Sequence, residues 1–120
     1  MSNHNVFLGL GSNLGDKRGN IEIAYNEIEK RIGSIISQSA FYITEPNGFI
    51  SDNIFCNTVC EVATELDVNN LLNEIMEIEK NVGRTSKSIV GVYSDCIIEI
   101  DILMYDDLIL ETEALIVPHP

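Results

Sequence analysis

The 120-residue sequence has no tryptophan, three prolines, three cysteines and only seven basic residues. Those seven stand against nineteen acidic residues, and the formal charge of -12 repels a phosphate backbone, so we expect no nucleic-acid partner. The odd cysteine count, without a CxxC pair, disfavours a zinc site or redox dithiol and favours a reduced, cytoplasmic setting. The sequence has neither a membrane-spanning apolar run nor the basic start of a signal peptide, so we expect a soluble protein with no membrane partner.

The length predicts a single domain over residues 1–120, because it suffices for one hydrophobic core but not for two. Hydrophobic residues make up 45% of the chain, and no low-complexity segment interrupts it. The high negative charge does not favour self-association, so we expect a monomer or weak homodimer. The same acidity repels nucleotides, so a phosphate site would need a few local basic residues and a divalent cation.

Apolar patterning predicts alternating strands and helices. The expected elements are a strand at 5–10, a helix at 16–32, strands at 34–43 and 54–64 that pair antiparallel, a helix at 67–82, a strand at 97–105, and a short extension at 106–120. Asp67 would cap the second helix, and Gly33 and Gly83 would end the two helices, the first in a left-handed conformation. This order predicts an α+β, ferredoxin-like βαββαβ fold with an antiparallel sheet and both helices on one face.

Two carboxylates stand two residues apart in the last long strand. Glu99 and Asp101 would project from one face while Ile98, Ile100 and Ile102 fill the other. Carboxylates that point inward from such an apolar strand are costly unless they are paired or bind a cation. Oxygen ligands of this kind suit Mg²⁺, which bridges substrate phosphates. A solvated sheet face is the alternative interpretation.

Other candidate residues each have a functional and a structural interpretation. Arg84 and Lys87 follow a helix end and could contact phosphates, although the same positions suit the helix dipole. His119 lies between two prolines and could face a site, or be an exposed terminal residue. Asn57 could bind the amide-like edge of a ligand with Phe55 or Tyr42 as a stacking surface, or these aromatic residues could belong to the core.

The whole chain resembles the 6-hydroxymethyl-7,8-dihydropterin pyrophosphokinase family through six segments that occur in order: GLGSNLGD, FYITEP, NTV, GR, EIDILMY and VPH. The combination is specific, although no single segment is. The resemblance implies a ferredoxin-like core that transfers pyrophosphate from ATP to the hydroxymethyl group of the pterin, with release of AMP, in folate biosynthesis. It also implies two Mg²⁺ ions, with ATP and the pterin bound side by side.

Matched position by position, the resemblance implies a role for each of several residues. The implied metal ligands are Glu99 and Asp101, and the implied catalytic residues are Arg84, Lys87 and Asp101. The implied ATP-binding residues are Glu79, Arg84, Lys87 and His119. The implied pterin-binding residues are Gly11, Ser12, Asn13, Thr44, Phe55, Asn57 and Tyr93.

Some positions depart from the family pattern. Cys96 replaces an arginine, Glu99 replaces an aspartate, and Ser86 replaces a second basic residue of the loop. The chain also stops just after His119, where the family continues through a further strand and helix, which would fit a truncated C-terminal end. These departures motivate two alternatives: a weakened or inactive relative that binds nucleotide or pterin without turnover, and an interaction module that binds neither.

Overall fold

The computed structural model describes residues 3–13, 15–44, 55–85, 98–111 and 115–119, and only the backbone of residues 44, 55, 84 and 85. Its elements are β1 (His4–Ser12), α1 (Lys17–Arg31), β2 (Gly33–Gln38), β3 (Tyr42–Thr44), β4 (Phe55–Thr64), α2 (Val68–Thr85), β5 (Glu99–Tyr105), β6 (Leu110–Glu111) and β7 (Ile116–Val117). In this part of the chain, no helix is long and apolar enough to cross a membrane.

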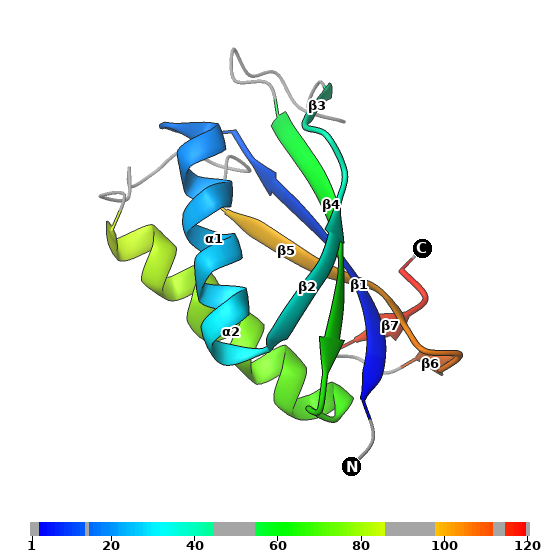
Figure 1. Ribbon diagram of the computed structural model, residues 1–120. Coiled ribbons are helices and arrows are strands. Elements are labelled where there is room, and N and C mark those ends of the chain that lie inside the picture. Colours follow the sequence, from blue (N-terminus) through cyan, green and yellow to red (C-terminus); the bar gives the residue numbers. More distant parts are fainter. Residues whose placement is uncertain (1–2, 14, 45–54, 86–97, 112–114, 120) are drawn as a thin grey trace.

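The large sheet is antiparallel and has the strand order β2-β4-β1-β5, with β3 paired to β4 beyond the end of β2. Both helices lie against the same face of this sheet (Figure 1). The predicted ferredoxin-like α+β arrangement is therefore confirmed. Its opposite face, which we call the open face, has no helix against it among the described residues.

The layer between the sheet and the helices is the hydrophobic core. Side chains that are almost fully buried there include Val6, Leu8 and Leu10 of β1, Ile100 and Ile102 of β5, Ile21, Ala24 and Ile28 of α1, and Leu71, Ile75, Ile78 and Val82 of α2. These positions follow the two-residue strand period and the 3.6-residue helix period, as the sequence predicted. Burial of each large aliphatic side chain contributes about 1.5–3 kcal/mol, so this layer is the main stabilising contribution to the fold.

Gly33 does not end α1 in a left-handed conformation, as the sequence predicted. The helix ends with Ile32 as its C-cap in the right-handed region, at φ -112° and ψ -55°, and Gly33 begins β2. A Cβ atom at Gly33 would overlap the backbone carbonyl oxygen of Ala63. Glycine is therefore required by the close approach of the β4 backbone.

Gly83 does not end α2 either, since the helix continues to Thr85. The preceding turn is anchored by Ile78 and Val82, which are fully buried, and this tertiary packing outweighs the low helix propensity of one glycine. A Cβ atom at Gly83 would meet no atom within 4 Å among the described residues. The predicted cap of the same helix is confirmed, because the Asn70 backbone N–H donates to Asp67 Oδ1 at 2.7 Å.

The strand predicted over residues 34–43 is interrupted. Gln38 pairs with Cys60 and Tyr42 pairs with Asn57, so four steps along this strand match three steps along β4. The extra residue is a β-bulge, which divides the segment into β2 and β3. The predicted antiparallel pairing with β4 is confirmed for both parts.

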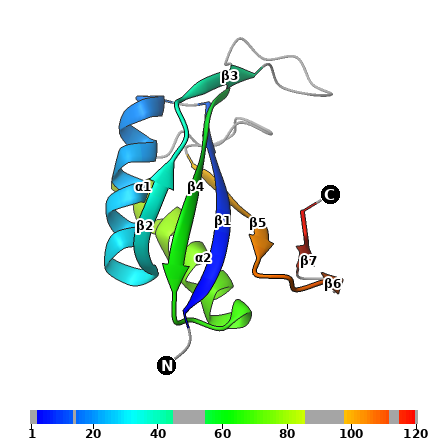
Figure 2. The ribbon, with the colours of Figure 1, turned by 45° about the vertical axis from the view of Figure 1, so that its right-hand side comes forward.

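The predicted C-terminal extension contains a small two-stranded sheet, β6 with β7, which lies beyond the end of β5 (Figure 2). The backbone N–H of His119 donates to the carbonyl oxygen of Leu103 at 3.0 Å. Because β5 is an edge strand of the large sheet, this bond attaches the extension to the free side of that edge.

The turn after β5 is attached to the start of β1. Asp106 has a left-handed φ of 48°, accepts the backbone N–H of Asn5 at 2.6 Å through Oδ1, and contacts His4 Nδ1 at 2.7 Å through Oδ2. The bond from Asn5, followed by that from His4, lowers the pKa of Asp106.

Two alanine substitutions should have opposite effects on stability. Gly33→Ala is expected to lower the free energy of unfolding by about 1–3 kcal/mol, because the new methyl group overlaps the β4 backbone. Gly83→Ala is expected to raise it by about 0.5–1 kcal/mol, because it removes a glycine from a helix interior. Urea unfolding followed by circular dichroism measures both values. Changes of the same sign would contradict the assigned backbone environments.

Asp106→Asn is expected to lower the unfolding temperature at neutral pH, because a carboxylate with a lowered folded pKa stabilises the protein while it is ionised. The difference from the parent should fade as the pH falls from about 4, the usual aspartate value, through the lowered folded pKa. Thermal unfolding across this pH range measures the difference. Asp107→Asn is the charge-matched control, and an equal loss in both variants would refute the role of Asp106.

Candidate functional site

The open face carries two rows of paired residues. The rows are Tyr42-Asn57-Gly11-Glu99 and Val59-Gly9-Asp101. The central strand of each row contributes only a glycine, so no β1 side chain separates the β4 positions, Asn57 and Val59, from the acidic positions of β5. Gly11 itself is buried, and the Leu103 side chain lies against Gly9, where an added Cβ atom would meet it at 3.3 Å.

Glu99 and Asp101 lie on the open face, whereas Ile98, Ile100 and Ile102 are buried on the helix side. The predicted segregation of the two sets is confirmed. The inward direction assumed for the carboxylates is wrong, because β5 has its helices on the isoleucine side. Both carboxylates are therefore accessible to ligands from solvent.

Like charges are concentrated at this end of β5. Desolvation is the first cause that raises the pKa of Glu99, and repulsion from Asp101 adds to it. The pKa of Glu79 is also raised, first by desolvation and then by Asp101 and Glu99, against the lowering effect of its bond from the Ile100 backbone. A bound cation would relieve this repulsion, so the electrostatics favour a cation-binding role.

Within the described ranges, no group of three or more His, Cys, Asp and Glu residues is arranged to hold a metal ion. Two carboxylates are nevertheless a sufficient protein contribution for Mg²⁺, which retains waters and takes further ligands from substrate phosphates. Glu99 and Asp101 fit that requirement in donor type and in position.

Glu79 reaches the edge of the sheet from α2. Its Oε2 accepts the Ile100 backbone N–H at 2.9 Å, and this N–H is available to Glu79 because β5 is an edge strand of the sheet. The bond places the Glu79 carboxylate next to the strand segment that carries Glu99 and Asp101. The third acidic residue named from the family resemblance is thus brought to the acidic pair.

His119 is also brought to the pair. Its Nε2 lies 3.8 Å from Asp101 Oδ1, and the two side chains are 43% and 39% exposed. The attachment of the extension to Leu103 positions the ring, although the two residues are far apart in sequence. The imidazole can act as a cation or hydrogen-bond donor at this end of the open face.

The predicted pterin-binding residues are only partly brought together. Asn57 of β4 lies opposite Gly11 of β1, and two residues before it in β4, Phe55 pairs with Thr44 of β3. Ser12 is fully buried on the helix side, where Asn20 Nδ2 donates to its Oγ at 3.2 Å. The observed contact of Ser12 is therefore with α1, and ligand binding by Ser12 stays a prediction.

Several predicted residues cannot be placed in the same detail. Asn13 is fully buried just after β1, and Arg84 lies in the last turn of α2, where only the backbone is described. Lys87, Tyr93 and the substituted position Cys96 lie outside the described residues.

Sequence reasoning missed Gly9 and its pairing with Asp101. The signal was present, because Gly9 and Gly11 have the two-residue spacing of a shared strand face. It also missed the bond from Ile100 to Glu79, which no spacing rule could reveal because it joins an edge strand to a helix.

The fold and the open face together define a ferredoxin-like α+β domain with an acidic pair on β5 and an asparagine on β4 on the same face of the sheet. The sequence model of 7,8-dihydro-6-hydroxymethylpterin-pyrophosphokinase matches residues 7–120. The chain therefore belongs to this family.

Relatives of known name agree. A 2-amino-4-hydroxy-6-hydroxymethyldihydropteridine pyrophosphokinase of Porphyromonas gingivalis is 40% identical over 116 residues, 96% of this chain and 79% of the relative. The Aquifex aeolicus protein of the same name is 38% identical over 96% of this chain and 69% of its own length. The structure of wild-type Plasmodium falciparum HPPK-DHPS matches with a TM-score of 0.68 at 18% identity, over 91% of this chain and 30% of that one. At that identity the likeness shows the fold alone.

In the presence of a chelator, Glu99→Gln is expected to raise the unfolding temperature at pH 7. Because folding raises the pKa of Glu99, its ionisation opposes folding, and stability falls as the pH rises from the unfolded value of about 4.3 through the folded pKa. The gain should vanish below about pH 4, where the residue is protonated in both states. Thermal unfolding with EDTA measures it. Glu77→Gln, on an exposed position of α2, is the control, and an equal gain there would contradict the repulsion.

Proposed function

We propose that this chain transfers pyrophosphate from ATP to the hydroxymethyl group of 6-hydroxymethyl-7,8-dihydropterin, with release of AMP, as a step of folate biosynthesis. The observation that carries the proposal is the cross-sheet row that joins Asn57 to Glu99 through Gly11. It provides a polar position for a heteroaromatic ring and an acidic position for a metal–phosphate group on the same face of the sheet. Family membership supplies the chemistry that matches these two positions.

Mg²⁺ is the proposed cofactor, held by Glu99 and Asp101. When bound, Mg²⁺ neutralises negative charge on the phosphates and helps to orient them. Two ions fit the family resemblance. Support from this chain is the raised pKa of Glu99, caused first by desolvation and then by repulsion from Asp101, since a bound cation would relieve that repulsion.

The remaining residues bind and orient the substrates. Asn57 would bond the amide-like edge of the pterin from β4, and His119 would donate to a phosphate or ribose oxygen beside Asp101. Arg84 and Lys87, which follow one another closely after the buried part of α2, would bind the phosphates. Their contribution is mainly alignment and charge stabilisation.

In the proposed reaction, the pterin hydroxymethyl oxygen attacks the β-phosphorus of ATP. The bond between that phosphorus and the oxygen bridging to the α-phosphorus breaks, and AMP leaves with this oxygen. The hydroxyl proton passes to solvent. Little covalent chemistry is asked of the protein, as is usual for transfer at phosphorus.

The test is a coupled assay of AMP release from Mg-ATP and 6-hydroxymethyl-7,8-dihydropterin. The parent should turn over, and Asp101→Asn should lower kcat/KM by about a hundredfold or more, because a metal ligand is lost. Asp107→Asn, the same chemical change in the exposed turn after β5, should leave the rate unchanged.

Cys96→Arg is a second arm of the assay, because it restores the arginine of the family pattern. A gain in rate would show that the parent is a weakened catalyst. If neither the parent nor this variant releases AMP, the proposed function is wrong. The comparisons give no preference to an inactive relative. The cytoplasmic location and the monomeric or weakly dimeric state stay predictions from the sequence.

A further inference from the structure

The β-bulge between β2 and β3 is built by the side chain of Ser39. The backbone N–H of Ser39 donates to the Val59 carbonyl oxygen at 2.8 Å, as in an ordinary ladder. The return bond is different, because the Val59 N–H donates to Ser39 Oγ at 2.9 Å. The Ser39 carbonyl oxygen instead accepts a hydrogen bond from Thr58 Oγ1 at 3.1 Å.

A buried tyrosine completes this hydroxyl cluster, which consists of Tyr25, Ser39 and Thr58. Tyr25 Oη lies 2.7 Å from Thr58 Oγ1. Since Thr58 donates its only hydroxyl hydrogen to Ser39, Tyr25 is the donor in this contact. Thr58 is 1% exposed and Tyr25 is 8% exposed, so the cluster connects α1 to the bulge through the core.

The bulge decides which of two neighbouring aromatic residues reaches the open face. In an unbroken strand, Phe41 would have the same facing as Ser39 and would lie opposite Asn57. The inserted residue moves Tyr42 into that position instead. Phe41 packs against the core side, and Arg18 Cζ of α1 lies 4.4 Å from its ring centroid.

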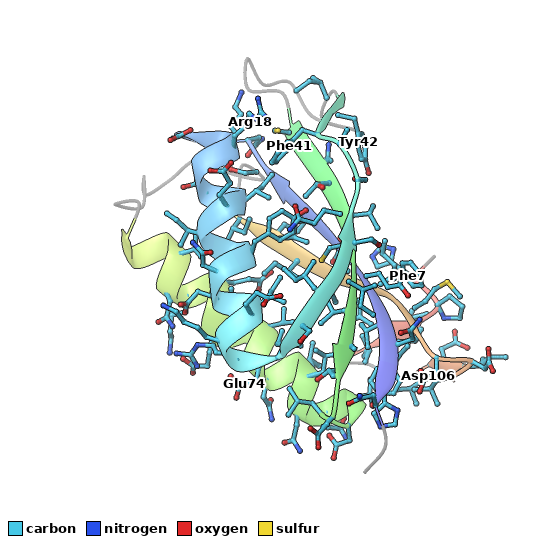
Figure 3. All side chains as sticks on the ribbon, viewed as in Figure 1. Phe7, Arg18, Phe41, Tyr42, Glu74 and Asp106 are labelled. Atoms are coloured by element: carbon cyan, nitrogen blue, oxygen red, sulfur yellow. The ribbon has the colours of Figure 1, made fainter. Side chains whose placement is uncertain are left out.

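The two aromatic residues therefore lie on opposite faces, with Phe41 beside Arg18 at the start of α1 and Tyr42 on the side of the sheet away from the helix (Figure 3). Tyr42 is 48% exposed and pairs directly with Asn57. An exposed aromatic ring beside an amide is suited to contact a planar heteroaromatic ligand.

We propose that Tyr42 contacts the pterin ring, and that Ser39 and Thr58 are positioning residues that turn Tyr42 onto the open face through the bulge. The inference rests on the proposed function, since it assigns Tyr42 to the pterin half of that site. It predicts that the same hydroxyl cluster affects pterin binding more than ATP binding, because the acidic pair lies across the sheet on β5.

The chain has no tryptophan, so single substitutions can report on each face. In Tyr42→Trp, bound pterin should reduce the acrylamide quenching constant by about half or more, because a ligand site covers most of the groups that it contacts. Phe41→Trp is the matched control on the other face, and pterin should leave its quenching constant unchanged. Equal protection in both variants, or protection of residue 41 alone, would overturn the inference.

Steady-state kinetics test the positioning role. Ser39→Ala should raise the KM for pterin about five- to tenfold, the equivalent of one hydrogen bond, with little change in kcat or in the KM for ATP. Ser39→Thr, which keeps the hydroxyl, should restore the parent value. A fall in kcat alone, or an equal rise in both KM values, would contradict the positioning role.

The experiments distinguish a failure of the proposed function from a failure of the role assigned to Tyr42. If pterin does not bind to the parent, the proposed function is wrong and the role of Tyr42 falls with it. If pterin binds and AMP is released, but residue 42 is not protected, only the present inference is overturned. Thermal unfolding of each variant verifies that the measured protein is folded.

Discussion

The pairing of β1 with both β4 and β5 is the constraint on which the site depends. This pairing places Gly11 between Asn57 and Glu99, and Gly9 next to Asp101. A slip by one residue would turn the acidic side chains into the core and the isoleucines into solvent, with loss of both the core and the site. The hydrophobic core and the candidate active site are therefore specified by one register, since each strand uses alternate residues for the two purposes.

The acidic pair opposes stability at the place where we propose that it binds a cation. Folding raises the pKa values of Glu99 and Glu79, first because it desolvates both carboxylates and then because it brings like charges together, so their ionisation opposes folding. The buried isoleucines of β5 and the bond from Ile100 to Glu79 offset this cost and keep the edge strand in place. The fold holds the two carboxylates close together before any ligand binds. A cationic ligand would relieve their repulsion without a further cost of bringing them together.

Contacts between segments that are far apart in the sequence position residues on both sides of the candidate site. On the β5 edge, the bond from His119 to Leu103 brings an imidazole to Asp101. On the β4 side, the hydroxyl cluster shifts the facing of one strand so that Tyr42 pairs with Asn57. Both attachments use backbone groups that a regular sheet ladder leaves available, at an edge or at a bulge.

The sequence by itself determined the order of the elements, the buried faces of the helices, the cap at Asp67 and the common face of Glu99 and Asp101, because these follow from local periodicity and short-range bonds. Only the tertiary structure decided that this common face is the open one, since that depends on which side the helices cover. It also decided that Gly33 serves a close strand contact, because the neighbouring backbone of Ala63 lies far away in sequence. Local patterns report the periodicity of a segment, whereas the face that a ligand meets is set by what packs against the other side.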